Sequence, residues 1–140
     1  MIWRVCNNVI LVNWLLWRRK ILDSPVCVKC DAGIESVEHM LLECEWTRVM
    51  WFVCCNGLRI RKERVTKFDV WWLNSIEVLK KNGKEVMMND VVYVCWQIWK
   101  IRCEMVLERK QISIDEAIRR KKVAIKEFYS LKWNLNISYR

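Results

Sequence analysis

Four residues near the N-terminus have the types and the spacing of a metal site. Cys27, Cys30, His39 and Cys44 follow the pattern C-x2-C-x8-H-x4-C. Three thiolates and one imidazole complete the tetrahedral set that structural Zn²⁺ sites use, and such a set leaves no open position for a substrate. The sequence therefore predicts one zinc ion with a structural role.

Two other interpretations of these residues stay open. The set is also compatible with a remnant that no longer binds metal, or with a redox pair formed by Cys27 and Cys30. A redox C-x2-C motif normally lies in a βαβ context, whereas the residues around this one have helical periodicity. Zinc binding is therefore the favoured hypothesis.

Short motifs surround these residues in a fixed order. They are Trp3 to Asn8 (WRVCNN), Arg18 to Ile21 (RRKI), Val37 to His39 (VEH), Cys44 to Arg48 (CEWTR) and Trp51-Phe52. Together with the metal residues, the series resembles the zinc-binding domain that follows the reverse transcriptase in plant non-LTR, LINE-like retroelements. Residues 98–102 (IWKIR) resemble the segment that leads toward the RNase H domain of such polyproteins.

The resemblance covers most of residues 3–110 and implies a retroelement zinc module. Two positions depart from the family pattern, because Leu11 stands where the family often has Pro and Cys103 where it often has Asn. Neither departure touches the four predicted ligands. Because the resemblance begins almost at Met1, we expect the chain to be a fragment of a longer element.

Basic residues outnumber acidic ones and give a net charge of +9. A positive field of this kind attracts phosphate backbones without reading sequence. The alternative is a set of solvated helix faces and helix C-termini, where Lys and Arg are favoured. The cluster beside the metal segment is our first choice for contact with RNA or DNA, and it consists of Arg59, Arg61, Lys62 and Arg64.

The residues needed for catalysis are missing from the sequence. His39 is the only histidine, there is no Tyr-x-Asp-Asp pair, and three scattered glycines cannot build a phosphate-binding loop. The acidic set of an RNase H domain is not recognisable either. We predict neither enzymatic activity nor a small-molecule substrate. The predicted function is a non-catalytic zinc module that contacts RNA or DNA, and the alternative is a docking spacer between polymerase and RNase H domains.

Cysteine content and hydropathy indicate the cellular compartment in which we expect the protein. The chain has eight cysteines, but its 54% apolar content supports a core without disulfides. Cys6, Cys95 and Cys103 lie on apolar helical faces, where a thiol behaves as a small buried hydrophobe. The apolar run at residues 9–17 is well short of the roughly 20 residues that span a membrane. We expect a reducing compartment, cytoplasm or nucleus, and no membrane insertion.

Helical periodicity dominates the chain and predicts an all-α fold with one zinc-organised turn and C-terminal amphipathic helices. Residues 1–57 are predicted as the zinc-binding domain, 58–85 as a basic connector with a Trp-rich helix, and 86–140 as a helical segment leading toward a missing RNase H domain. Expected helices cover residues 2–21, 36–55 and 66–81, and two more begin at Asp90 and after Ser113. The clearest apolar stripe is Val92, Cys95, Trp96, Trp99, Cys103 and Val106.

The spacing of two predicted ligands conflicts with a regular helix. His39 and Cys44 are five residues apart, so an undistorted α-helix separates them by about 140°. Ser36 is a good N-cap for this helix. We therefore predict that the helix is tightened, loosened or frayed between the two ligands. The surrounding carboxylates, Glu35 among them, are expected to be solvated.

Overall fold

The computed structural model describes residues 4, 10–55, 57–61, 63, 67–120, 123 and 126. Its elements are α2 (Asn13–Arg18), the π-helix η1 (His39–Glu43), α3 (Glu45–Cys54), α4 (Phe68–Lys81) and α5 (Met87–Leu107). Residues 114–120 are also helical. Within these ranges the extended pairing is limited to one antiparallel bridge between Val26 and Ile34. The all-α prediction is confirmed.

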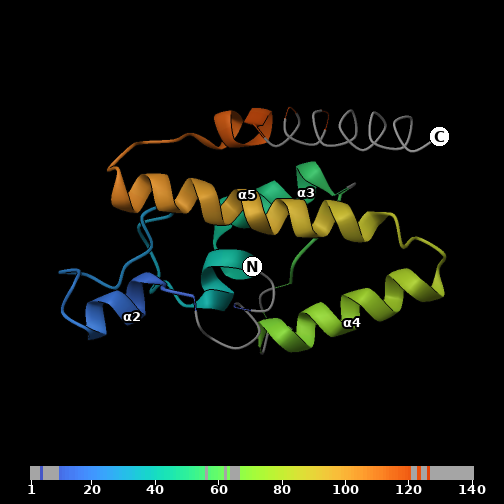
Figure 1. Ribbon diagram of the computed structural model, residues 1–140, viewed down its shortest axis with the longest axis horizontal. Helices are drawn as coiled ribbons and strands as arrows, with labels where there is room; N and C mark the ends of the chain where they lie inside the picture. Colours follow the sequence, from blue (N-terminus) through green and yellow to red (C-terminus); the bar gives the residue numbers. More distant parts are fainter. Residues whose placement is uncertain are drawn as a thin grey trace, which may run out of the picture.

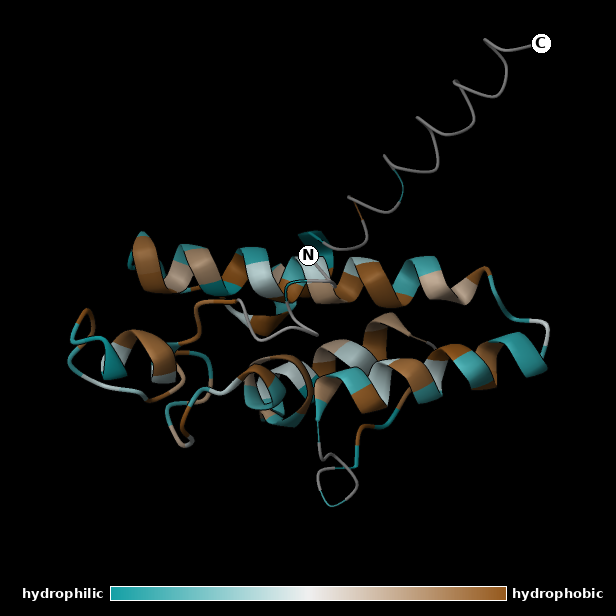
Figure 2. Cartoon of the chain, turned by 60° about the horizontal axis from the view of Figure 1, so that its bottom comes forward, coloured by the Kyte–Doolittle hydropathy of each residue, from teal (hydrophilic) through white to brown (hydrophobic). Residues whose placement is uncertain are grey.

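The long helix α5 runs across the molecule and forms one layer (Figure 1). Helices α2 and α4 lie below it in Figure 2, and the chain turns back between α4 and α5. Helix α5 contacts η1, α3 and α4. The core therefore lies between α5 and the segment that carries the predicted metal ligands.

Apolar side chains from three elements fill this core. Met40, Leu41 and Leu42 of η1 are fully buried, as are Met50 and Trp51 of α3. Helix α5 contributes Val94, Cys95, Ile98 and Ile101. Fully burying one large apolar side chain contributes about 1.5–3 kcal/mol, so the contact between these elements is a major source of stability.

Helix α5 presents a different face to the core than its sequence predicted. Val92 and Trp96 of the predicted stripe are 39% and 43% exposed, whereas Val91, Val94 and Ile98 are buried. A shift of one residue rotates a helix face by about 100°. Both faces of α5 are apolar, so the contact with η1 and α3 decides which one is buried.

Of the three thiols predicted to be buried, Cys95 is buried, Cys103 is half-buried and Cys6 lies outside the described residues.

The N-terminal helix is shorter in the described residues than predicted. Helix α2 has six residues and follows an extended Val12, while the predicted positions 2, 3 and 5–9 lie outside the described part of the chain. Trp14, Trp17 and Ile21 are 39%, 44% and 65% exposed. These apolar side chains on and just after α2 are therefore more than a third exposed.

Helix α4 packs against the core through its aromatic side chains. Phe68 is buried, and Trp71 and Trp72 pack against the core. At the start of the helix, the Phe68 N–H donates to Glu38 Oε1 at 3.2 Å. Gly83 follows the helix with φ of +65°, the left-handed conformation expected of a C-terminal glycine.

A buried ion pair joins the N-terminal segment to α5. Arg102 Nη2 lies 2.9 Å from Glu35 Oε1, and the two side chains are 2% and 0% exposed. Arg102 also donates to Asn13 Oδ1 at 2.7 Å, and the Asn13 N–H donates to Glu35 Oε1 at 2.8 Å. The expectation that Glu35 is a solvated charge is wrong, because the carboxylate neutralises a buried guanidinium.

Residues after α5 continue the helical pattern. Ser113 Oγ accepts from the Glu116 N–H at 3.2 Å, which confirms the predicted cap. Arg120 of this segment lies 2.7 Å from Glu104 of α5. None of the helices that the structure describes combines the length and the apolar character needed to cross a membrane.

Candidate metal centre

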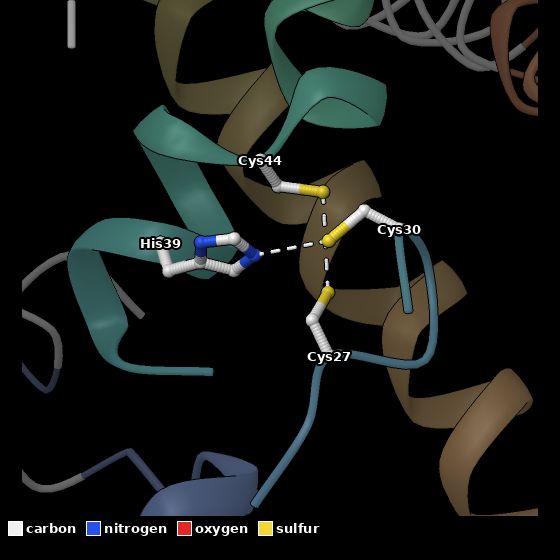
Figure 3. Close-up of side chains that lie close together, drawn as sticks. All are labelled: Cys27, Cys30, His39 and Cys44. Carbon is white, nitrogen blue, oxygen red and sulfur yellow. Dashed lines mark hydrogen bonds between the residues drawn. The ribbon is translucent and has the colours of Figure 1, made fainter. Parts of the chain in front are cut away.

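The four predicted metal ligands converge on one point (Figure 3). The ligand atoms of Cys27, Cys30, His39 and Cys44 all lie within 4.8 Å of one another. Cys30 Sγ lies 3.3 Å from His39 Nε2, and Cys27 Sγ lies 3.9 Å from Cys44 Sγ. Two ligands at 2.3 Å from a tetrahedral Zn²⁺ are about 3.8 Å apart. The donor set therefore fits zinc in both chemistry and spacing.

A narrow hairpin-like turn positions the first two cysteines. The Cys27 N–H donates to Gly33 O at 2.8 Å, and the Asp31 N–H donates back to Cys27 O at 2.9 Å. Asp31 takes the left-handed conformation, with φ of +55°. The turn thus brings Cys30 back toward Cys27, as the C-x2-C motif predicts.

Gly33 lies directly against the imidazole ring of His39. A Cβ atom at Gly33 would lie 2.7 Å from His39 Cε1 and 3.2 Å from His39 Nδ1. A change of chain direction is not the reason for glycine here, because Asp31 makes the turn. The reason is the imidazole ring, which lies directly against the Gly33 backbone.

A π-turn resolves the spacing conflict between His39 and Cys44. The Cys44 N–H donates to His39 O at 2.9 Å, a bond from residue i+5 to residue i. This wider turn stacks the two ligands one turn apart, where a regular α-helix would separate them. Cys44 then leaves the helical conformation with ψ of 134°, and α3 begins at Glu45. Ser36 Oγ caps the segment by accepting from the His39 N–H at 3.0 Å.

The helix break leaves backbone carbonyls that side chains satisfy. Lys29 Nζ and Thr47 Oγ1 both donate to Met40 O, at 2.8 and 2.6 Å. Trp51 Nε1 donates to Leu41 O at 2.6 Å. A buried carbonyl without a partner costs free energy, so these three side chains stabilise the interrupted helix that carries two of the ligands.

Electrostatics around the cluster favour a thiolate. Cys27 Sγ donates to Cys44 Sγ, and this hydrogen bond is the main cause that lowers the pKa of Cys44 to about 3. The same contact and burial raise the pKa of Cys27. Burial lowers the pKa of Lys29, and the nearby sulfurs of Cys44 and Cys27 oppose that shift. Thiolates are the form that binds metal, so binding releases the remaining protons.

A protein-family model described as zinc-binding in reverse transcriptase matches residues 1–51. The matched segment and the Cys₃His cluster fit a reverse transcriptase zinc-binding domain. The description of that family names a metal-binding role. No curated protein and no solved structure matches the chain at a significant level.

The zinc-binding segment and α5 share a core, although α5 lies beyond the family match. The match ends at Trp51 inside α3, while Arg102 of α5 neutralises the buried Glu35 of the metal segment. Ile98 of α5 belongs to the same apolar cluster as Met40 and Leu41. The matched segment is therefore completed by residues far along the chain.

Two of the four predicted nucleic-acid residues lie beside an open groove at the edge of α3. Arg59 and Arg61 line this groove and are exposed, whereas Lys62 and Arg64 lie outside the described residues. We call this feature the arginine groove. It has a volume of about 690 Å³ and is lined by Glu45, Arg48, Val49, Phe52, Leu58, Arg59, Ile60, Arg61 and Glu63.

Several residues of the metal centre and of the arginine groove were not predicted from the sequence. Arg48 and Phe52 belong to the arginine groove, and their spacing of four along one helix could have indicated a shared face. Lys29 lies between two predicted ligands, but nothing in the sequence shows that its ammonium group contacts Met40. The pairing of Glu35 with Arg102 spans 67 residues and has no local signal.

Proposed function

We propose that the chain is a non-catalytic, zinc-stabilised module of retroelement reverse transcriptase origin, and that it contacts RNA or DNA through the arginine groove. The observation that supports this most is the gathering of Arg48, Arg59 and Arg61 along one groove. Arg48 comes from α3 and the other two from the connector, so two separate segments bring their charges to one place.

These guanidinium groups are available for phosphates. All three side chains are exposed, and no ion pair ties any of them to a carboxylate among the described residues. Glu45 and Glu63 line the same groove and offset part of its charge. We therefore expect weak binding with little sequence preference, because phosphate contacts position a nucleic acid without reading it.

Charge reversal in the groove tests this function. Arg59→Glu with Arg61→Glu should weaken binding to RNA and DNA and reduce its dependence on salt. Each lost phosphate contact should reduce the log–log salt slope by about 0.9 on duplex DNA and about 0.7 on single strands. Lys80→Glu with Lys81→Glu changes the net charge equally at the end of α4 and is the matched control. Equal effects of the two double variants, or binding independent of salt, would contradict the proposal.

A docking role is the second candidate, and the apolar surface of α2 favours it. Leu11, Trp14, Trp17 and Ile21 are all more than a third exposed and lie in the family-matched segment. Exposed apolar patches are typical of protein–protein contacts. A polymerase domain held through this surface should be released by Trp14→Ser with Trp17→Ser, while nucleic-acid binding stays unchanged.

The proposed origin also sets the compartment. A site built from Cys27, Cys30 and Cys44 needs reduced thiols. We therefore propose that the module acts in the cytoplasm or nucleus, as part of a plant retroelement protein.

A further inference from the structure

The aromatic residue in the arginine groove points to one class of nucleic acid. Phe52 is 46% exposed although it lies among the residues that line the groove. The Arg59 guanidinium carbon lies 5.6 Å from the centre of its ring. An exposed aromatic ring beside a guanidinium is the arrangement on which unpaired bases stack.

We infer that the arginine groove binds single-stranded nucleic acid, with a base against Phe52 and phosphates against the flanking arginines. This inference rests on the proposed function and adds the class of ligand. In a duplex the bases are stacked and paired, so only phosphates would reach the groove and Phe52 would contribute nothing. In a single strand every base has a free π-face, and the ring gains a stacking partner whatever the sequence.

Replacing the ring separates stacking from charge. Phe52→Leu keeps an apolar side chain but removes the π-face, and Phe52→Ala removes both. Binding of a labelled 15-nucleotide RNA, the same DNA strand and the matching DNA duplex would be measured at one salt concentration. Loss of a stacked base should weaken single-strand binding about 5- to 150-fold and leave duplex binding unchanged. Trp17→Ala is the matched control, because Trp17 is 44% exposed on α2, outside the residues that line the groove.

The outcomes distinguish this inference from the function on which it rests. Wild-type single-strand affinity in both Phe52 variants, with loss in the Arg59 and Arg61 reversals, overturns the stacking inference and leaves the proposed function standing. Equal weakening of single strands and duplex in Phe52→Leu also overturns the inference. Loss confined to single strands supports it, and the RNA and DNA strands then show which sugar is preferred.

A separate observation concerns the lysine between the first two ligands. The Lys29 ammonium group donates to Met40 O at 2.8 Å and to Thr47 Oγ1 at 2.7 Å. It also lies 5.3 Å from the centre of the Trp46 ring. These contacts tie the C-x2-C turn to the π-turn that carries His39 and to the start of α3.

We propose that Lys29 is a positioning residue for the metal ligands. Its hydrogen bonds hold the two halves of the Cys₃His set together, because Cys27 and Cys30 lie on one side of the contact and His39 and Cys44 on the other. Zinc with three thiolates and a neutral imidazole carries a net charge of −1. The Lys29 ammonium, held by its hydrogen bonds to Met40 O and Thr47 Oγ1, would offset that charge.

Substitution of Lys29 should weaken the metal site without removing a ligand. Partners that orient ligands typically contribute 10- to 100-fold to metal affinity, so Lys29→Met should weaken zinc binding by about that factor in competition with a chelator. Co²⁺ bound in place of zinc reports ligand geometry, and we expect its visible absorption bands to shift and weaken. Lys81→Met is the matched control, because Lys81 is an exposed lysine at the end of α4 and lies outside the residues around the metal turn.

If Lys29→Met does not fold, a second variant tests the same positioning role. Thr47→Val preserves shape and removes the hydroxyl that joins Lys29 to Met40 O. It should also weaken zinc binding and alter the Co²⁺ spectrum. Wild-type affinity and a wild-type spectrum in Lys29→Met, or in Thr47→Val where the former is unfolded, would overturn the positioning role.

Discussion

Each ligand of the candidate metal centre has a distinct local support. Cys27 is held by the antiparallel contact with Gly33, and Cys30 is the last residue of the turn over residues 28–30. His39 follows the Ser36 cap, and Cys44 ends the π-turn. Because the two pairs come from separate segments, a bound ion would join the hairpin-like turn to the interrupted helix. Loss of one ligand should therefore disturb both the hairpin-like turn and the interrupted helix.

Cys30→Ser is the direct test of the donor set. Serine keeps the size of the side chain but removes the thiolate, so we expect the loss of stoichiometric zinc and of order in residues 26–45. Structural zinc supplies about 10–16 kcal/mol of apparent binding free energy in small fingers. Metal content would be measured by mass spectrometry under native conditions, with Cys103→Ser as control. Unchanged zinc content in Cys30→Ser would contradict the assignment.

Gly33→Ala tests the close approach between the turn and the imidazole. The added methyl group would lie 2.7 Å from His39 Cε1, so the ring or the turn must move. We expect zinc affinity to fall about 10- to 100-fold, as it does when a ligand loses its orientation. Gly83→Ala is the contrast, because Gly83 has a positive φ but nothing within 4 Å. Gly83→Ala should lower the free energy of unfolding and leave zinc affinity intact. If Gly33→Ala has that same effect, Gly33 is needed only for its backbone.

At the scale of elements, the interrupted helix and α5 depend on each other. The π-turn exposes carbonyls that Lys29, Thr47 and Trp51 satisfy, and the ring of Trp51 is buried in the core beneath α5. Arg102 of α5 then reaches Glu35 just before the π-turn. The metal segment is therefore stabilised from one side by its own side chains and from the other by α5.

Arg102→Met should be strongly destabilising. It leaves Glu35 buried without its positive partner, and breaking a buried pair in this way costs about 3–5 kcal/mol. Adding Glu35→Gln removes the stranded charge and should restore much of the loss. Urea denaturation at fixed free zinc would measure the free energy of unfolding of each variant. If the double variant is no more stable than Arg102→Met alone, uncompensated charge is not the cause.

At the scale of the whole molecule, one metal site and one core should make folding and metal binding a linked equilibrium. An ion that binds only the folded state stabilises it by RT ln(1 + [L]/Kd), about 1.4 kcal/mol for each tenfold rise in free zinc above Kd. The core described above lies directly against the ligands, so we expect a single unfolding transition.

The slope of stability against free zinc counts the ions involved. Thermal or urea unfolding in metal buffers should give about 1.4 kcal/mol per tenfold change in free zinc, and a chelator should lower the midpoint. Cys30→Ser should show no such dependence. A slope twice as large would mean a second ion per chain, and no slope would mean that the fold does not need the metal.

The sequence by itself determined the chemistry of the centre and the class of fold. Ligand type and spacing are local properties, so Cys27, Cys30, His39 and Cys44 could be read directly, and the mismatch between His39 and Cys44 already required a distorted helix. Helical periodicity and caps such as Ser36 and Ser113 are equally local, which is why the all-α class and several helix ends agree with the structure.

Only the tertiary structure decided which apolar and charged residues meet. The stripe of α5 was predicted about one residue away from the buried face, because both faces are apolar and only the contact with η1 and α3 chooses between them. Glu35 looked like a surface charge because its partner Arg102 is 67 residues away. Lys29 and Phe52 gained their roles in the same way, from neighbours that the chain brings together only when α3, the connector and the metal turn have packed.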